Sequence, residues 1–293
     1  MPNRALLVVN PASRRGREAL GRAERQLEGL GVELVPAPRT DPTQMSEIIR
    51  QERGRIDRVI VAGGDGTLNA ALQGLAGTGL PLAVLPLGTA NNLARTLGIP
   101  PSLEAACRLA AHGARRWIDL GWVNGRYFFT TASIGLSVQI TEVLTYQTKQ
   151  RWGALAYAVA AFKALARSRP FHAEITWNGG KRHSRTVQVV VGNGRYYGSA
   201  LPVAEDATID DARLDLYSLE VGRWWELITL LPSLRRGSHG RKRSVEALRA
   251  TEFEIQTGHP LAVNVDGEIC SQTPACFRVM PRALEVFAPA RET

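Results

Sequence analysis

The chain has 293 residues, 44% of them hydrophobic, which is enough for two domains of ordinary size that each bury a core. Its formal net charge of +9 indicates anionic partners, such as a nucleotide, acidic lipid headgroups or nucleic acid. Three cysteines without metal-ligand spacing argue against a disulfide-bonded secreted protein and favour the reducing cytoplasm, and five scattered histidines argue against a zinc site.

The first third of the chain alternates predicted strands with predicted helices. Apolar runs at residues 6–9, 59–62 and 82–85 are typical of buried strands. Residues 19–30 and 68–75 have the apolar spacing of helices with one buried face. Alternation of this kind with short connections predicts a parallel sheet covered by helices, up to about residue 113.

Two further helices are predicted from the residues that would begin them. Thr40 and Asp41 precede Pro42, and proline suits the first position of a helix. Ser102 is a good capping residue for a helix that ends near Gly113.

Three predicted strands of this region end in polar turns. Residues 63–69 read GGDGTLN, residues 86–95 read PLGTANNLAR, and residues 10–13 read NPAS. Because ligands bind beyond the carboxyl ends of the strands in such sheets, the three turns should face one crevice. Glycines allow the backbone to approach an anion, and a helix N-terminus offers N–H donors. This chemistry favours a nucleotide polyphosphate.

The second half of the chain is predicted to be mostly β. Three pairs flanked by strand-type residues predict hairpins: Asn124–Gly125, Asn178–Gly179 and Asp266–Gly267. The first of them would join a strand at 117–123 to one at 126–132. Helices are expected near 150–166 and 223–235.

Taken together, these motifs closely resemble the diacylglycerol kinase catalytic family in its bacterial soluble lipid kinase branch. Sphingosine and ceramide kinases are similar, and NAD kinase is a more distant relative. The late Asp-Asp and Asp-Gly-Glu elements favour the lipid kinases, whereas Gly-Gly-Asp-Gly-Thr is shared with NAD kinases. The resemblance covers essentially the whole chain and rests on residues 10–11, 63–69, 86–95, 149–153, 192–194, 197–198, 209–211 and 265–268.

The resemblance implies an α/β nucleotide-binding domain of NAD kinase type followed by a mostly β domain, a β-sandwich. We expect residues 1–122 in the first domain, with residues 279–293 returning to it, and residues 123–278 in the second. The nucleotide would then lie in the cleft between the domains, and the lipid headgroup would enter from the other side.

The glycine turn and its polar neighbours are the predicted ATP site. The backbone N–H groups from Gly63 to Thr67 would hold phosphate, and the hydroxyls of Thr67 and Thr89 would add donors. Thr40 matches a family position associated with ATP, although a simple helix cap explains it equally well. The complete predicted set is Asn10, Pro11, Ser13, Thr40, Gly63, Gly64, Asp65, Gly66, Thr67, Asn69 and Thr89.

The resemblance also implies the catalytic residues. Glu268, in the Asp-Gly-Glu element, matches the general base. Asp65 is the rival for that role, but we favour a part in organising Mg²⁺ and phosphate. A second, structural Mg²⁺ is implied at Asp211 with the carbonyls of Thr208 and Arg213, since adjacent carboxylates suit a hard ion. A solvated acidic turn explains Asp210–Asp211 equally well, and Ala212 stands where the family usually has glycine.

Residues 223–249 combine apolar bulk with a basic cluster at 235–243, which predicts peripheral association with an anionic membrane. A core helix followed by a solvated basic loop accounts for the same residues. The apolar stretch at 152–165 is too short to span a bilayer. No nucleic-acid-binding module is recognisable, so we expect no nucleic acid partner. The sequence leaves the oligomeric state open, with a homodimer as one arrangement.

The sequence therefore predicts a cytoplasmic, membrane-peripheral kinase that uses ATP and Mg²⁺ to phosphorylate a lipid hydroxyl. Diacylglycerol, giving phosphatidic acid, is the leading acceptor. Two alternatives stay open: a soluble metabolite kinase of NAD kinase type, and a catalytically silent module that binds lipid or nucleotide.

Overall fold

The computed structural model describes residues 3–9, 14–35, 44–143, 169–194, 196–197, 201–202, 208–220 and 245–290. Some sequence predictions fall outside these ranges and stay predictions. They are the ATP residues Asn10, Pro11, Ser13 and Thr40, the motif at 149–153, the helices near 150–166 and 223–235, and the basic cluster at 235–243.

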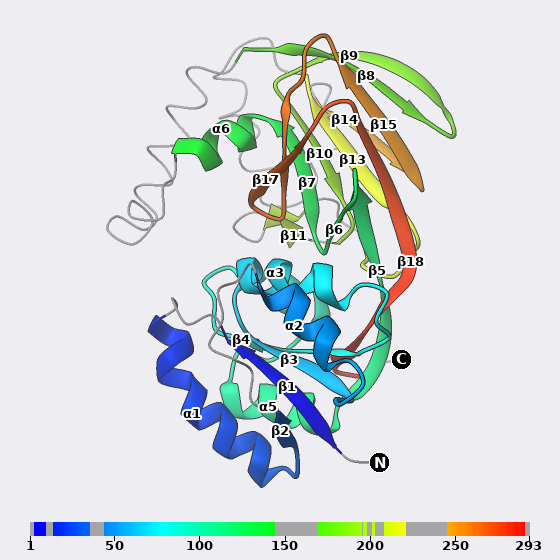
Figure 1. The fold of residues 1–293 in the computed structure, drawn as a ribbon. Coiled ribbons are helices and arrows are strands. Elements are labelled where there is room, and N and C mark those ends of the chain that lie inside the picture. Colours follow the sequence, from blue (N-terminus) through cyan, green and yellow to red (C-terminus); the bar gives the residue numbers. More distant parts are fainter. Residues whose placement is uncertain are drawn as a thin grey trace.

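The N-terminal half is a parallel sheet between two pairs of helices. Four strands lie in the order β2-β1-β3-β4, namely Glu33–Val35, Arg4–Val9, Arg58–Gly63 and Leu82–Pro86. Helix α1 packs beside α5 and helix α2 beside α3, and the two pairs cover opposite faces of the sheet (Figure 1). The helices are α1 (Arg14–Gly29), α2 (Met45–Glu52), α3 (Asp65–Leu75), α4 (Asn92–Leu97) and α5 (Leu103–His112). This arrangement confirms the predicted α/β domain.

A long C-terminal strand, β18 (Ala275–Ala288), joins the two halves of the molecule (Figure 1). It pairs in parallel with β4 at Val286 and antiparallel with β5 (Ala114–Val123) along most of its length. Its first part pairs with β15 (Glu252–Thr257). One sheet of ten strands therefore runs through both halves. Because β5 and β18 cross the region near residues 122 and 279 without a break, the domain boundaries there remain a prediction.

The C-terminal half consists of two antiparallel layers. In the large sheet, β15 continues to β8 (Phe171–Trp177) and β9 (Gly180–Thr186). The second sheet has the order β14-β13-β10-β7-β16-β17, namely Val245–Ala250, Leu214–Leu219, Gln188–Gly192, Thr131–Gly135, Ala262–Val265 and Glu268–Gln272. Apolar side chains of both layers form one buried cluster that includes Phe128, Ile134, Ile175, Val189, Phe253 and Phe277. The predicted β-sandwich is thus confirmed.

Local sequence signals located several elements well. All three predicted hairpins are present, as β5–β6, β8–β9 and β16–β17. Helix α5 begins after Ser102, whose hydroxyl accepts a hydrogen bond from Ala105 N, and it ends at Gly113.

Two features of the second half differ from the sequence prediction. The strand expected at 126–132 is two strands, β6 (Arg126–Phe128) and β7 (Thr131–Gly135), which belong to different sheets. The chain crosses between the sheets at Phe129–Thr130, where the backbone N–H groups donate to the carboxylate of Asp266, which is distant in the sequence. Helix α6 (Leu136–Val143) and the short pair β11 (Tyr196–Tyr197) and β12 (Leu201–Pro202) were not anticipated.

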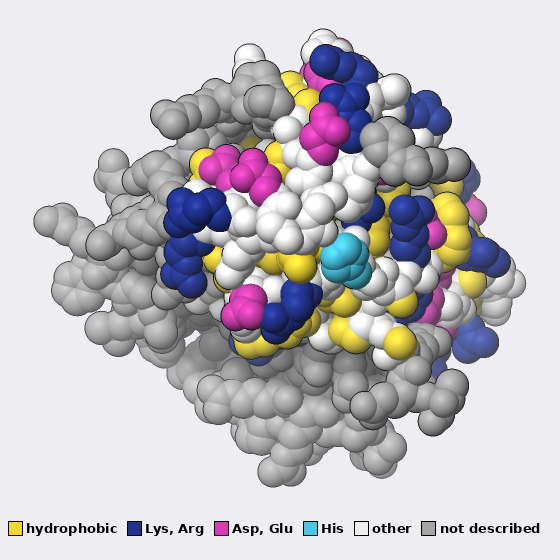
Figure 2. All heavy atoms as spheres, turned by 90° about the horizontal axis from the view of Figure 1, so that it is seen from below, with side chains coloured by type: hydrophobic (Ala, Val, Ile, Leu, Met, Phe, Trp, Pro, Cys, Tyr) yellow, Lys and Arg dark blue, Asp and Glu magenta, His cyan; other side chains and the backbone are white. Residues whose placement is uncertain are grey.

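The described surface carries its charge in mixed form. On the face seen in Figure 2, Lys and Arg side chains alternate with acidic ones. Exposed ion pairs such as Arg4–Glu33 and Arg108–Glu104 show the same intermixing. Among the helices that the structure describes, none is long and apolar enough to cross a bilayer.

Candidate functional site

The first glycine turn joins β3 to α3. The N–H groups of Thr67 and Leu68 both donate to Gly64 O, at 3.0 and 3.1 Å, and so close the first turn of the helix. A Cβ on Gly63 would lie 2.5 Å from Thr67 Oγ1, so glycine is needed for Thr67 to pack against the strand end. Gly66, by contrast, is exposed, and a Cβ there would meet nothing within 4 Å. The open side of the predicted phosphate cradle is therefore at Gly66, while the Thr67 N–H is used inside the turn.

The second glycine turn crosses directly over the first. A Cβ on Gly88 would lie 2.5 Å from Gly64 Cα, and one on Gly64 would lie 2.9 Å from Gly88 Cα. Asn91 holds this turn, because its side chain accepts from Gly88 N at 2.9 Å and donates to Gly88 O at 3.0 Å. Asn91 has φ of 50°, a left-handed conformation that asparagine tolerates well. The role of Asn91 was missed from the sequence, and Thr89 between these residues is exposed.

Asp65 connects the two turns. Its Oδ1 accepts a hydrogen bond from Leu93 N at 3.4 Å, so the carboxylate lies at the N-terminus of α4, where N–H groups are otherwise unpaired. Burial raises the pKa of Asp65 and the charge of Asp266 raises it further, whereas the N–H groups of Leu93 and Asn92 act in the opposite direction. Asn69, also in the predicted ATP set, is buried in α3.

Across from the glycine turns lies the β16–β17 hairpin, and Asp266 anchors it. Its Oδ1 accepts from the backbone N–H groups of Thr130 and Thr131 and from the Thr130 hydroxyl, at 3.1, 3.0 and 2.5 Å. Its Oδ2 accepts from Phe129 N at 2.7 Å. These four donors hold the chain where it crosses between the sheets. Burial raises the pKa of Asp266 even against their combined effect.

The backbone of this hairpin is also tightly specified. Asp266 and Gly267 both have positive φ, 47° and 95°, as a two-residue hairpin turn of this kind requires. Asn264 Oδ1 accepts from Gly267 N at 2.8 Å, and Asn264 Nδ2 donates to Thr141 on α6, also at 2.8 Å. Sequence reasoning identified the turn but missed the anchoring role of Asp266. The sequence held one hint of this role: asparagine would serve the turn equally well, so the choice of aspartate pointed to a use for its second oxygen.

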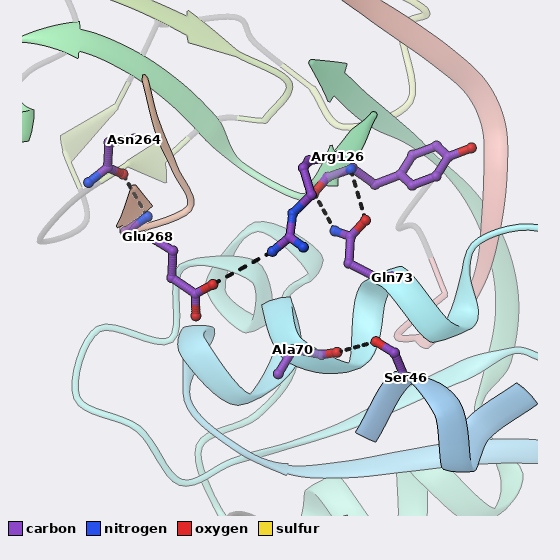
Figure 3. Close-up of polar contacts among 8 residues, drawn as sticks. Ser46, Ala70, Gln73, Arg126, Asn264 and Glu268 are labelled. Atoms are coloured by element: carbon purple, nitrogen blue, oxygen red, sulfur yellow. Dashed lines mark hydrogen bonds and ion pairs between the residues drawn. The ribbon is translucent and has the colours of Figure 1, made fainter. Parts of the chain in front are cut away.

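Glu268 follows this turn and points away from it. Its side chain is 49% exposed, and its Oε2 lies 3.9 Å from Arg126 Nη2 at the start of β6 (Figure 3). The carboxylate is therefore accessible to a ligand, while its neighbour two residues earlier is engaged with backbone donors.

The predicted second cation site lies in the 208–213 loop. Asp211 Oδ1 accepts from Arg213 N at 3.1 Å, which folds the loop back on itself. Burial raises the pKa of Asp211, and the charges of Asp215 and Asp119 raise it further. No group of three or more His, Cys, Asp or Glu side chains suited to a metal occurs in the described ranges, but the predicted site relies on one carboxylate and two carbonyls.

Asp119, which sequence reasoning missed, fixes this loop to the rest of the fold. The residue is only 3% exposed, and its two oxygens accept from Ala212 N at 2.6 Å and from Arg282 N at 2.8 Å. Asn193, in the Gly192–Gly194 motif, donates to Asp119 O and Phe129 O at 2.9 and 3.0 Å. That motif thus ties β5 to the crossing between the sheets.

Comparison with known proteins identifies this arrangement. Residues 4–123 match the model of the diacylglycerol kinase catalytic domain, and residues 130–288 match that of the YegS C-terminal NAD kinase beta sandwich-like domain. The chain belongs to the diacylglycerol kinase catalytic family. A diacylglycerol kinase of Bacillus subtilis (strain 168) is 29% identical over 98% of this chain and 96% of the relative. One from Staphylococcus aureus (strain JH9) is 29% identical over 99% and 93%.

Solved structures agree on the fold. A crystal structure of a diacylglycerol kinase from Bacillus anthracis str. Sterne superposes with a TM-score of 0.81, at 23% identity, over 98% of this chain and 97% of the other. Membership in the diacylglycerol kinase family implies a kinase, which the sequence had indicated. The structure brings the hairpin that carries Glu268 to helix α3, which begins with Asp65 at the first glycine turn (Figure 3).

Proposed function

We propose that this protein transfers the terminal phosphoryl group of ATP to a hydroxyl of a membrane lipid, with diacylglycerol as the first acceptor. One observation carries the proposal: on the hairpin from the other half of the molecule, the Glu268 carboxylate points toward helix α3, which begins at the first glycine turn (Figure 3). A donor site and an exposed carboxylate therefore stand at one interface. Phosphoryl transfer needs little more than alignment, compensation of charge and a base near the acceptor.

The glycine turns would hold the phosphates of ATP. Their backbones cross at Gly64 and Gly88 with no room for a side chain, while Gly66 opens to the surroundings. Two helices, α3 and α4, begin at these turns, so their positive dipole ends lie at the turns. These features fit a polyphosphate.

Glu268 would act as the general base and accept the proton of the lipid hydroxyl. Its exposed carboxylate is free of backbone donors in the described contacts, unlike that of Asp266, and Arg126 at 3.9 Å limits where it lies. Asp65 lies at the start of α4, where Leu93 N donates to it at the long distance of 3.4 Å, and beside the glycine turns that would hold the phosphates. We therefore assign Asp65 to the organisation of metal and phosphate.

Two positions fit Mg²⁺, which when bound supplies charge compensation. Hard carboxylate and carbonyl oxygens are the ligands that this ion prefers. Asp65 is one such position, beside the phosphate turns. The second is Asp211 with the carbonyls of Thr208 and Arg213. The neighbouring charges of Asp215 and Asp119 would favour a cation there.

The decisive experiment is phosphoryl transfer from labelled ATP, with Mg²⁺, to a panel of lipids in mixed micelles. The panel holds diacylglycerol, phosphatidylglycerol, a sphingoid base, ceramide and a polyprenol, and NAD is offered in a parallel tube. We expect labelled phosphatidic acid. Label on another lipid would replace the acceptor, and label on NAD alone would overturn the proposal in favour of a metabolite kinase. Binding of ATP without any transfer would indicate a silent binding module.

We also propose that the enzyme is cytoplasmic and meets its lipid at an anionic membrane surface, through the basic cluster at 235–243. This rests on the sequence. Neutralising Arg241, Lys242 and Arg243 together should weaken sedimentation with vesicles that contain phosphatidylglycerol and leave ATP binding unchanged. Unchanged sedimentation would assign these charges to an ordinary solvated loop. A homodimer also stays a proposal, which sedimentation equilibrium would test.

A further inference from the structure

Gln73 on α3 forms two hydrogen bonds to the backbone of Tyr127 on β6. Gln73 Nε2 donates to Tyr127 O at 2.8 Å, and Gln73 Oε1 accepts from Tyr127 N at 3.1 Å (Figure 3). Both hydrogen-bonding groups of one side-chain amide are thus matched to both groups of one backbone residue. The pair is partly buried, and 54 residues separate its members.

The position of Tyr127 in β6 explains why both of its backbone groups can form hydrogen bonds with Gln73. In the β5–β6 hairpin, Val123 faces Arg126 next to the two-residue turn, and Trp122 faces Tyr127. Opposed pairs alternate between bonded and non-bonded in an antiparallel ladder, so the N–H and C=O of Tyr127 point outward from the edge. An edge strand with free backbone groups pairs readily with another peptide. The amide of Gln73 takes the place of one residue of a further strand.

Helix α3 is itself fixed on its other side by α2. Arg50 Nη2 donates to the backbone O of Gln73 at 2.6 Å. Ser46 Oγ donates to Ala70 O at 2.8 Å, as Figure 3 shows. A Cβ on Gly74 would lie 2.5 Å from Ser46 Cα, so the two helices are in backbone contact. Gln73 therefore projects from a helix that cannot shift independently of the N-terminal half.

Strand β6 and the residues after it contact the hairpin that carries Glu268, the proposed base for the lipid hydroxyl. Arg126, the residue before Tyr127, lies 3.9 Å from the Glu268 carboxylate. Phe129, two residues after Tyr127, donates to Asp266, which anchors the same hairpin. Residues 126–131 thus hold α3 on one side and the Asp266–Glu268 hairpin on the other. The other end of α3 is the glycine turn, about two helical turns, or roughly 12 Å, from Gln73.

We infer that Gln73 is a positioning residue that sets where Glu268 stands relative to the phosphate-binding turn, through the Gln73–Tyr127 amide pair. The inference rests on the proposed function, because Glu268 must act on the lipid hydroxyl for its placement to matter. A displacement of about 1 Å at a reacting group can cost about a hundredfold in rate, so a residue outside the chemistry can control it.

The test compares lipid phosphorylation by four proteins: wild type, Gln73→Met, Glu268→Gln and the double variant. Methionine keeps the length and helix preference of glutamine but forms neither hydrogen bond. We expect Gln73→Met to lower kcat by about ten- to a hundredfold, with the KM for ATP unchanged. In the Glu268→Gln background the same substitution should cause no further loss, because residues that act as a unit are non-additive.

Gln51→Met is the matched control. Gln51 lies on the neighbouring helix α2 and donates to Glu47 on its own helix, so its loss should leave kcat unchanged. If Gln73→Met does not fold, Gln73→Glu serves instead. It can still accept from Tyr127 N but places a carboxylate oxygen against Tyr127 O, and the same fall in kcat is expected. Circular dichroism establishes that each variant is folded.

The outcomes are distinguishable. A wild type that phosphorylates no lipid contradicts the proposed function and, with it, this inference. An active wild type with undiminished kcat in Gln73→Met overturns the inference alone, even if the Tm falls, because a merely structural contact affects stability and not turnover of the folded enzyme. Independent, multiplicative losses in the double variant overturn it as well, since Gln73 would then not act through Glu268.

Discussion

Asp65 and Asp266 are two aspartates in glycine-containing turns, one from each half of the molecule, yet their carboxylates are used differently. Asp266 accepts four hydrogen bonds from Phe129, Thr130 and Thr131. Asp65 accepts from Leu93 N at 3.4 Å, a long contact. Burial raises the pKa of both. The carboxylate of Asp266 is saturated by the protein, whereas that of Asp65, with its long contact to Leu93 N, is the one that we propose for a ligand.

Within each of the two motifs, some residues build the fold and others are available for chemistry, although the sequence alone does not tell them apart. In the Asp-Gly-Glu element, the aspartate builds the hairpin and the glutamate two residues later is left accessible. In the Gly-Gly-Asp-Gly element, the glycines build the turn and the aspartate lies between two helix N-termini. A carboxylate with all of its lone pairs used holds structure, whereas one with few donors is the candidate for chemistry.

The largest effect should come from Glu268→Gln. This substitution keeps the shape of an exposed side chain, so the Tm and ATP binding should stay close to wild type. Turnover should fall by about two to four orders of magnitude, the usual contribution of a general base. The assay is the initial rate of lipid phosphorylation at saturating ATP.

Glu104→Gln is its control, because Glu104 is likewise an exposed glutamate beside an arginine, Arg108. It should retain full activity. Wild-type turnover in Glu268→Gln would remove this residue from the mechanism and return Asp65 to the role of base.

Asp266→Asn should instead damage the fold. An asparagine side chain has one carbonyl oxygen, so its NH₂ group must face a backbone N–H that now has no acceptor. Leaving such donors unpaired should lower the free energy of unfolding by about 2–3 kcal/mol. Urea unfolding followed by circular dichroism measures this.

Asp57→Asn serves as the comparison, since Arg4 N is the one backbone donor to Asp57 among the contacts of the described residues, and a carbonyl oxygen can accept from it equally well. Its effect should be under about 1 kcal/mol. Equal stability of Asp266→Asn and wild type would mean that the four hydrogen bonds do not anchor the hairpin.

The pH dependence of stability should distinguish Asp65 from an ordinary surface aspartate. Its pKa is raised in the folded protein above the ordinary 3.8. The stability that protonation contributes is therefore fully present below 3.8 and lost as the pH rises through the raised value. Relative to Asp65→Asn, the wild type should gain stability as the pH falls from about 7 to about 4. Urea unfolding of both proteins in EDTA tests this, and a difference independent of pH would contradict it.

The sequence was most informative where a feature depends on neighbouring residues. Ser102 and Gly113 bound α5 because a cap and a helix end are local, and the Asp266–Gly267 turn needs only its own two residues. The glycine turns belong to the same class, since the crossing of Gly64 and Gly88 joins two short motifs that each stood out.

What the sequence did not reveal depends on distant partners. The break after Phe128 requires Asp266, because Phe129 and Asp266 are 137 residues apart. Asp119 and Arg282, which fix the acidic loop and β18, are 163 residues apart. No periodicity or turn signal reports such a contact, so a strand was expected to continue where the fold bends it.

The smallest effect tests a third buried carboxylate, that of Asp119, through the loop that it holds. The N–H of Ala212 donates to Asp119 while Ala212 adopts a left-handed conformation, with φ of 57°. The resemblance described in the sequence analysis leads us to expect glycine at this position. That conformation costs a residue with a Cβ about 1–2 kcal/mol. Glycine avoids this cost, but its greater conformational entropy in the unfolded chain cancels part of the gain. Ala212→Gly should therefore stabilise the protein by about 0.5–1 kcal/mol, whereas Ala105→Gly inside α5 should destabilise it by a similar amount. Urea unfolding of both measures the signs. Destabilisation by both would mean that the loop relaxes around Ala212 and that Asp119 does not impose its conformation.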